Sequence, residues 1–105
     1  MQQEYEKDIQ KSIIEYLRLK RYCVFKHHST GFRKDTQGQA VPFRHGDKGI
    51  ADIIGCSPTG QFIAIEVKRK GGKPSPDQLE FIRRINESGG KAIVAFSIDE
   101  VIQAF

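Results

Sequence analysis

The sequence predicts an α/β fold, a mixed β-sheet flanked by helices in the order α-β-β-β-α-β-α. Three observations predict it. Residues 4–20 have apolar side chains at helical spacing, a turn sequence joins two runs rich in Ile and Val at residues 49–55 and 61–68, and a capped helix at residues 75–90 precedes an apolar strand. With 105 residues, the chain is expected to form a single domain over residues 1–105.

The composition favours a polyanionic partner and disfavours several other classes of protein. The 17 Lys plus Arg residues outnumber the 13 Asp plus Glu residues and give a net charge of +4, which suits a nucleic acid. Cys23 and Cys56 lack a CxxC spacing, and we interpret both as reduced core cysteines. No apolar run reaches membrane-spanning length and the N-terminus is not signal-like, so a cytoplasmic protein without membrane contact is expected. A metabolic enzyme is disfavoured, because the sequence has no P-loop, dinucleotide fingerprint or serine elbow.

The first predicted helix carries one acid on its apolar side. At 100° per residue, Glu6 lies about 20° from Ile13 and so projects from the apolar stripe. Two interpretations remain open: a partner in a functional site, or a first-turn glutamate favoured by the helix dipole with its carboxylate in solvent. The stripe itself consists of Tyr5, Ile9, Ile13, Tyr16 and Leu17.

A strand at residues 22–28 and a long polar segment at residues 29–48 follow the helix. A connection of this length is often functional, and we expect either a DNA-contacting flap or a short irregular hairpin. His27, His28 and His45 lack the spacing of zinc ligands, so phosphate contact is favoured over catalysis. The residues of the segment expected to contact DNA are Arg33, Lys34, Arg44, His45 and Lys48.

The turn between the two apolar runs sets the register of a predicted β-hairpin. Pro58 suits a type I turn, and Gly60 suits the left-handed residue that closes a three-residue loop. Pairing Ser57 with Gln61 then matches Ile54 with Ala64, Asp52 with Glu66, and Ile50 with Lys68. Strand alternation places Asp52, Glu66 and Lys68 on one face, where opposed Cβ atoms lie about 4.5 to 5.5 Å apart.

This arrangement predicts a metal site. Two opposed carboxylates repel each other unless a cation lies between them. Oxygen ligands without Cys or His favour Mg²⁺ or Mn²⁺, and the carbonyl of Val67 is a further candidate ligand. The alternative is an ordinary ion pair between Glu66 and Lys68, which leaves Asp52 unexplained.

The basic loop after the hairpin and the capped helix add further candidates. Arg69, Lys70 and Lys73 are expected to contact phosphate, with a merely solvated loop as the alternative. Ser75 is the predicted N-cap, and Gln78 occupies the capping-box position, which accounts for it without a function; we retain it as a possible site residue. The predicted buried stripe of this helix is Leu79, Ile82 and Ile85.

The last two elements are a strand and a short helix. The continuous apolar run at residues 91–96 predicts a central strand covered on both faces. Ser97 and Glu100 predict a second capping box. Val101, Ile102 and Phe105 supply the apolar side chains of the terminal helix.

Together these features resemble the PD-(D/E)XK nuclease superfamily, and within it the VRR-NUC branch of virus-type replication-repair nucleases. The resemblance covers nearly the whole chain. One departure is Ala51, which stands where the superfamily name has proline and which supplies no ligand. The matching residues are Glu6 in EKDIQ, Asp52 in GIADII, Glu66 and Lys68 in IEVK, and Gln78 in SPDQLEFI.

The resemblance implies a catalytic site and a function. Asp52 and Glu66 would be metal ligands for Mg²⁺ or Mn²⁺, Lys68 would position or activate the attacking water, and Glu6 with Gln78 would complete the site. The expected function is a metal-dependent, structure-selective DNA endonuclease similar to Holliday-junction resolvases, acting as a homodimer in a bacterial or virus-infected host cell. The alternatives are a nuclease of the same fold acting on flaps or linear duplex, and a non-catalytic DNA-binding module.

Overall fold

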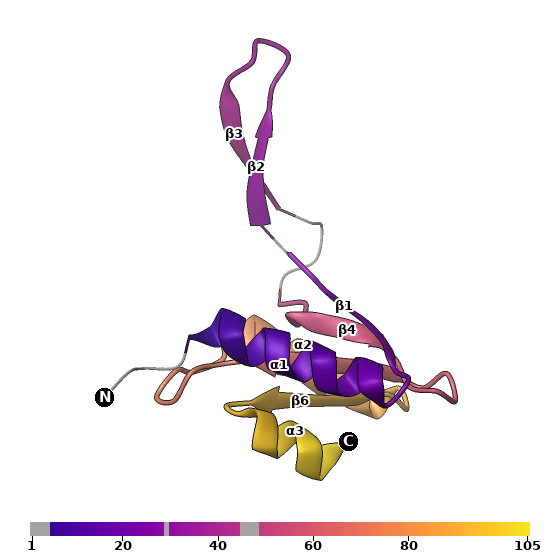
Figure 1. The fold of residues 1–105 in the computed structure, drawn as a ribbon. Coiled ribbons are helices and arrows are strands. Elements are labelled where there is room, and N and C mark those ends of the chain that lie inside the picture. Colours follow the sequence, from indigo (N-terminus) through magenta and orange to yellow (C-terminus); the bar gives the residue numbers. More distant parts are fainter. Residues whose placement is uncertain (1–4, 29, 45–48) are drawn as a thin grey trace.

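The computed structural model describes residues 5–28, 30–44 and 49–105. Within these ranges, three helices and six strands follow one another (Figure 1). None of the helices in these ranges is both long and apolar enough to span a membrane. The elements are α1 (Glu6–Leu19), β1 (Cys23–Lys26), β2 (Thr30–Lys34), β3 (Ala40–Arg44), β4 (Ile53–Cys56), β5 (Phe62–Val67), α2 (Pro76–Glu87), β6 (Lys91–Ala95) and α3 (Ile98–Ala104).

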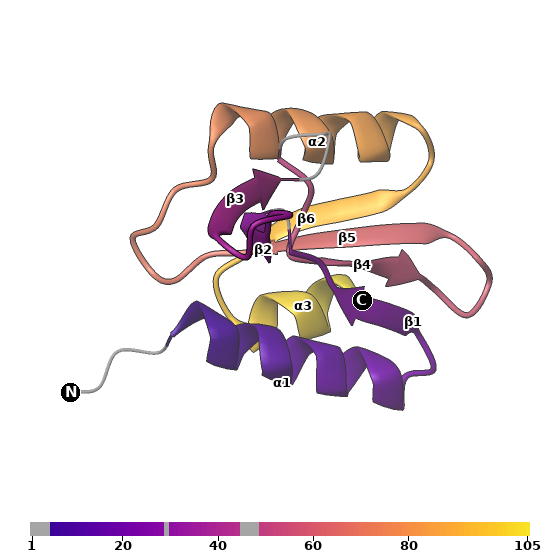
Figure 2. The same ribbon diagram turned by 90° about the horizontal axis from the view of Figure 1, so that it is seen from above.

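The core is a four-stranded mixed sheet in the order β1-β4-β5-β6. Strand β5 is antiparallel to β4 and parallel to β6. Helices α1 and α3 cover one face, and α2 covers the other (Figure 2). Without β2 and β3, the order is the predicted α-β-β-β-α-β-α, and the predicted α/β fold is confirmed.

The larger core cluster fills the space between the sheet and α1 with α3. Alternation along β5 sends Ile63, Ile65 and Val67 into this cluster and Ala64 to the α2 side. The side chains that α1 contributes are Ile9, Ile13 and Leu17, as the helical spacing predicts. Tyr5, in contrast, is 62% exposed, because it precedes the first turn of α1.

The predicted hairpin register is confirmed. Ile54 pairs with Ala64, and the N–H of Ser57 donates to the carbonyl of Gln61 at 2.8 Å. Gly60 has a φ of 89°, the left-handed conformation that the three-residue loop requires. Since the side-chain period of a strand is two, this turn decides which β5 side chains face the core.

The predicted central position of the last strand is wrong. β6 (Lys91–Ala95) is an outer strand of the described sheet, paired with β5 alone. Both of its faces are nevertheless covered, by α2 and by α3. A continuous apolar run indicates that both faces of a strand are covered. It does not indicate how many strands pair with it.

The long polar segment contains the hairpin that was one of the two expectations. Strands β2 and β3 pair in regular antiparallel register from Thr30 with Arg44 to Lys34 with Ala40. The hairpin projects away from the sheet (Figure 1). At its tip, the carboxylate of Asp35 accepts the backbone N–H groups of Gln37 and Gln39, both at 2.9 Å.

The predicted core position of the two cysteines is also wrong. Cys23 and Cys56 lie directly opposite each other in the β1–β4 ladder as free thiols. Cys23 is exposed and Cys56 is half-buried. The physical reason is the position of β1 at the edge of the sheet, while α2 packs over β5 and β6.

Helix α2 begins as predicted, and two of the three residues of its predicted buried stripe face the sheet. The Ser75 hydroxyl accepts the N–H of Gln78 at 3.1 Å, and the Gln78 side chain accepts the N–H of Ser75 at 2.7 Å, which completes the capping box. Leu79 is 50% exposed, contrary to prediction. Ile82 and Ile85 pack against the sheet as predicted, and Phe81 takes the place expected for Leu79. Leu79 lies about 60° beyond Ile82 around the helix.

The predicted capping box of α3 (Ile98–Ala104) forms in a shifted version. The Ser97 hydroxyl accepts the N–H of Glu100 at 3.3 Å, but the Glu100 carboxylate accepts the N–H of Phe96, not that of Ser97. Val101 is fully buried, whereas Ile102 is 46% exposed.

Candidate active site

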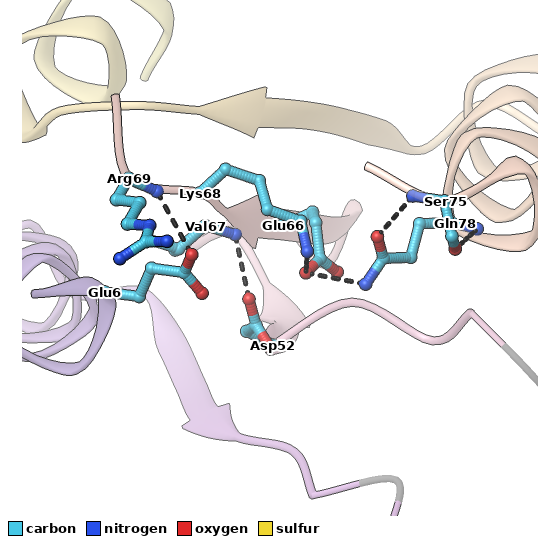
Figure 3. Close-up of polar contacts among 8 residues, drawn as sticks. All are labelled: Glu6, Asp52, Glu66, Val67, Lys68, Arg69, Ser75 and Gln78. Atoms are coloured by element: carbon cyan, nitrogen blue, oxygen red, sulfur yellow. Dashed lines mark hydrogen bonds and ion pairs between the residues drawn. The ribbon is translucent and has the colours of Figure 1, made fainter. Parts of the chain in front are cut away.

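Glu66 is the buried acid at the centre of the site. It lies on the central strand β5, and only 2% of its surface is exposed. Its Oε1 accepts a hydrogen bond from Nε2 of Gln78 at 3.0 Å and lies 3.8 Å from Nζ of Lys68 (Figure 3). Within the described residues, Oε2 has no hydrogen-bond partner. A buried acceptor in this state needs a donor or a cation.

Asp52 is held beside Glu66 by the backbone of both neighbouring strands. Its carbonyl accepts the N–H of His27 at 2.7 Å, and its Oδ2 accepts the N–H of Val67 at 2.9 Å. The predicted ladder pairing of Asp52 with Glu66 does not form, since the β4–β5 ladder ends at Ile53 with Ile65. The chain bends at Asp52. The Asp52 carboxylate, in place of a backbone carbonyl, therefore accepts the N–H of Val67.

Glu6 reaches the same region from the first turn of α1. Its Oε2 accepts the N–H of Arg69 at 3.2 Å, one residue after Lys68 (Figure 3). Glu6 is half-buried. Of the two interpretations of this acid, the structure supports a partner in the site rather than a carboxylate directed only to solvent.

The surroundings of Glu66 disfavour its ionised form, mainly because the carboxyl is buried. Burial, the hydrogen-bonding proximity of Asp52 and its charge raise the pKa of Glu66 from 4.5 to about 8. That value already includes a small increase from Glu6 and an opposing decrease from Lys68. The neighbouring lysine therefore compensates only part of the cost of ionising Glu66. The ion pair between Glu66 and Lys68 is present in the structure. It does not offset the whole cost of ionising Glu66 beside Asp52.

Gln78 connects the start of α2 to the site. Its amide oxygen caps the helix at Ser75 while its amide nitrogen donates to Glu66. This dual use is possible because Gln78 lies between Phe81, Ile82 and Ile85 around the helix axis, on the side facing the sheet. The capping interpretation is thus correct but incomplete.

Comparison with known proteins shows the family to which this chain belongs. The family profile of the VRR-NUC domain matches residues 4–98. The chain belongs to the VRR-NUC family. Two solved structures have similar folds. The first, a VRR-NUC domain, is 24% identical with a TM-score of 0.66, and the match covers 95% of this chain and 96% of the other. The second, a VRR-NUC domain protein, is 22% identical with a TM-score of 0.60, and the match covers 98% of this chain and 86% of the other. No curated protein matches the chain.

Membership makes this chain a nuclease-type domain that processes DNA and therefore binds it. The fold agrees with the PD-(D/E)XK architecture. The residues that carried the sequence resemblance, Glu6, Asp52, Glu66, Lys68 and Gln78, lie around one point at the end of β5 (Figure 3).

The donor set of this VRR-NUC domain fits a hard divalent cation, although the site is small. In the described ranges, no group of three or more His, Cys, Asp or Glu residues is arranged to hold a metal ion. Asp52 and Glu66 nevertheless offer two adjacent carboxylates, and the unpartnered Oε2 and raised pKa of Glu66 mark a place for positive charge. Oxygen donors favour Mg²⁺ or Mn²⁺. Val67 can contribute only its backbone carbonyl, because its side chain is a hydrocarbon without a ligand atom.

The raised pKa of Glu66 predicts how stability depends on pH in the metal-free VRR-NUC domain. Between pH 4.5 and about 8 the native carboxyl stays protonated while the unfolded one ionises, so the native state binds more protons. The free energy of unfolding should therefore fall as pH rises through this window. Glu66→Gln should be more stable than wild type at pH 8, by on the order of a few kcal/mol.

Thermal unfolding of both proteins in a chelator, from pH 4.5 to 8.5, measures this difference. The two proteins differ only at residue 66, so the gap between the curves reports Glu66 together with its interactions with neighbouring charged groups. Parallel curves across the whole range would contradict the prediction. Adding Mg²⁺ to wild type at pH 8 should narrow the gap.

The residues predicted to contact DNA are distributed over two parts of this VRR-NUC domain. Arg69, Lys70 and Lys73 are exposed in the loop after β5, and only Arg69 touches a site residue, through its backbone. Lys34 is exposed at the end of β2. Arg33 and Arg44 are at ladder positions of the β2–β3 hairpin, whereas His45 and Lys48 lie outside the described residues.

Proposed function

We propose that this VRR-NUC domain is a divalent-metal-dependent, structure-selective DNA endonuclease that hydrolyses phosphodiester bonds in branched DNA, in the manner of a Holliday-junction resolvase. One observation carries the proposal. The buried Glu66, with an unpartnered Oε2, lies beside Asp52 and 3.8 Å from the ammonium of Lys68. A purely structural ion pair between Glu66 and Lys68 would not require Asp52 beside it.

Asp52 and Glu66 would hold Mg²⁺ or Mn²⁺, with the Val67 carbonyl as a further ligand, and the ion would supply Lewis-acid polarisation of the phosphate. Gln78 fixes the orientation of Glu66 through the 3.0 Å hydrogen bond. Asp52 is fixed in turn by the N–H of Val67. The two carboxylates are thus preorganised by the fold before substrate arrives.

Lys68 is placed to act on the nucleophile. It follows directly on β5, its side chain is 19% exposed, and its ammonium is therefore both near Glu66 and accessible to solvent. We assign Lys68 the role of holding the attacking water and of donating to the phosphate oxygens as negative charge develops. Glu6 has a supporting role, because it ties α1 to the backbone of Arg69.

DNA would reach this site between the projecting hairpin and the basic loop. Arg33, Lys34, Arg44, His45 and Lys48 in or beside the hairpin, and Arg69, Lys70 and Lys73 in the loop, are our proposed phosphate contacts. A four-way junction requires two symmetry-related cuts, and a site of this size cuts one strand at a time. A two-fold homodimer satisfies that requirement.

The test is a panel of labelled four-way junction, flap, bubble and linear duplex substrates, incubated with Mg²⁺ or Mn²⁺ at one salt concentration. Wild type should cut the junction faster than its component duplexes. Lys68→Ala should lower the rate by on the order of 100-fold without lowering affinity to a similar extent. Arg84→Ala is the matched control, since it removes one positive charge from the exposed side of α2, which contributes none of the proposed phosphate contacts.

The outcome separates the competing functions. Preference for flaps or linear duplex would keep the chemistry and replace the substrate. Binding to DNA without cleavage in any divalent ion would indicate a non-catalytic DNA-binding module.

A further inference from the structure

A groove between α1 and β1 is lined mainly by positive charge. These two elements run side by side on the edge of the domain (Figure 2). The groove has a volume of about 400 Å³, and four of its seven lining residues are basic against a single acid, Glu15. The basic residues are Lys7, Lys11, Arg18 and Lys26.

These charges are not neutralised by the protein. Within residues 5–28, 30–44 and 49–105, Lys7, Lys11 and Lys26 form no ion pair, and all three are exposed. Arg18 donates to a backbone carbonyl, that of Val24, at 3.1 Å. The surface of α2 differs, because Arg83 is paired there with both Glu80 and Glu87.

A buried polar side chain in the groove also lacks a partner. Gln10 is 8% exposed and lines the groove. Among the described residues its Oε1 accepts no hydrogen bond. Buried amide groups in proteins are nearly always satisfied. A purely solvated basic face of a helix would not require a buried amide at its base.

The groove leads away from the acids of the active site. Lys7 follows Glu6 directly in α1, and Lys26 precedes His27, whose N–H binds the carbonyl of Asp52. From Lys7 to Arg18, α1 rises about 16 Å at about 1.5 Å per residue. A strand whose backbone runs along this length would present several phosphates to the groove.

We propose that this groove binds the sugar-phosphate backbone of the DNA strand that is cut, on one side of the scissile phosphate. The proposal rests on the proposed function and adds the path of the substrate strand. Lys7, Lys11 and Lys26 neutralise successive phosphates, and Gln10 offers its amide to the sugar or to a bridging water. The four-residue spacing of Lys7 and Lys11 is visible in the sequence, but only the fold brings Lys26 to the same groove.

The experiment measures DNA affinity in chelator, where cleavage plays no part. Lys7→Ala/Lys11→Ala removes two charges from α1, and the matched control Arg83→Ala/Arg84→Ala removes two from the exposed side of α2. Titration of a labelled junction at several salt concentrations should show a salt slope reduced by about 2 for the α1 variant, since each lost phosphate contact contributes about 0.9. Affinity at low salt should fall about tenfold or more, and the control should keep the wild-type slope.

An α1 variant with the wild-type slope, a control variant that loses as much as the α1 variant, or a wild type without affinity for DNA would each overturn the proposal. Circular dichroism of each variant verifies its fold. The proposed function can fail independently: a protein that binds through this groove but cuts with no divalent ion would refute the nuclease activity and leave the groove assignment standing.

Discussion

Replacing Glu66 with glutamine should lower the single-turnover rate of DNA cleavage by on the order of 10³-fold or more. The substitution keeps the shape of the side chain, and its amide oxygen can still accept the hydrogen bond from Gln78. What it removes is the negative charge beside Asp52, which the proposed metal binding requires. Asp52→Asn should have an effect of similar size, because it removes the other half of the same pair.

The design excludes unfolding as the cause. At neutral pH Glu66→Gln is expected to be at least as stable as wild type, since it removes a buried carboxyl whose pKa is raised to about 8. Glu80→Gln is the matched control, an acid-to-amide change on the exposed face of α2. Rates are measured with enzyme in excess over labelled junction in saturating Mg²⁺ or Mn²⁺. Full activity in either site variant would refute the assignment.

Gly55→Ala should destabilise the fold by about 3 kcal/mol or more. Gly55 pairs with Val24 in the β1–β4 ladder. A Cβ built there would lie 2.0 Å from the carbonyl oxygen of Cys23 and 2.7 Å from Cα of Val24. Both are backbone atoms, so β1 would have to move away from β4. Activity should fall too, because β1 leads directly to His27, which holds Asp52.

Chemical denaturation followed by far-UV circular dichroism measures this change, since the chain has no Trp for fluorescence. Gly38→Ala is the comparison variant. Gly38 has a φ of 83° and nothing within 4 Å of an added Cβ, so it should cost only about 1 to 2 kcal/mol of left-handed strain. A Gly55→Ala protein as stable as the Gly38→Ala protein would show that the strands separate easily.

Local features of the fold could be predicted because adjacent residues decide them. The turn at Pro58 and Gly60 specifies a loop length, and the loop length specifies that Ile54 lies opposite Ala64. Ser75 and Gln78 satisfy each other's backbone within one helical turn. Errors came where a pattern has two physical causes, as at β6, whose apolar run reflects two covered faces and not a central position.

The sequence indicated which residues would lie together at the candidate site, but not how they are arranged there. Spacing and resemblance selected Glu6, Asp52, Glu66, Lys68 and Gln78, and the structure brings these side chains together at the end of β5, while their catalytic roles stay a prediction. The bend at Asp52, which directs its carboxylate to the N–H of Val67, was not predictable, since it depends on competition between a side chain and a ladder carbonyl. The direction of Leu79 was also missed, because packing of α2 on the sheet selects which stripe is buried.

The sequence by itself determined the types and order of the core elements and the hairpin register, and it indicated the candidate acids of the site. These follow from periodicity, turn chemistry and capping, which act over a few residues. Only the tertiary structure decided that β6 is an outer strand, that Gln78 reaches Glu66, and that Lys26 shares a groove with Lys7 and Lys11. Those arrangements depend on contacts between residues far apart in the chain, and no local pattern records which surfaces will meet.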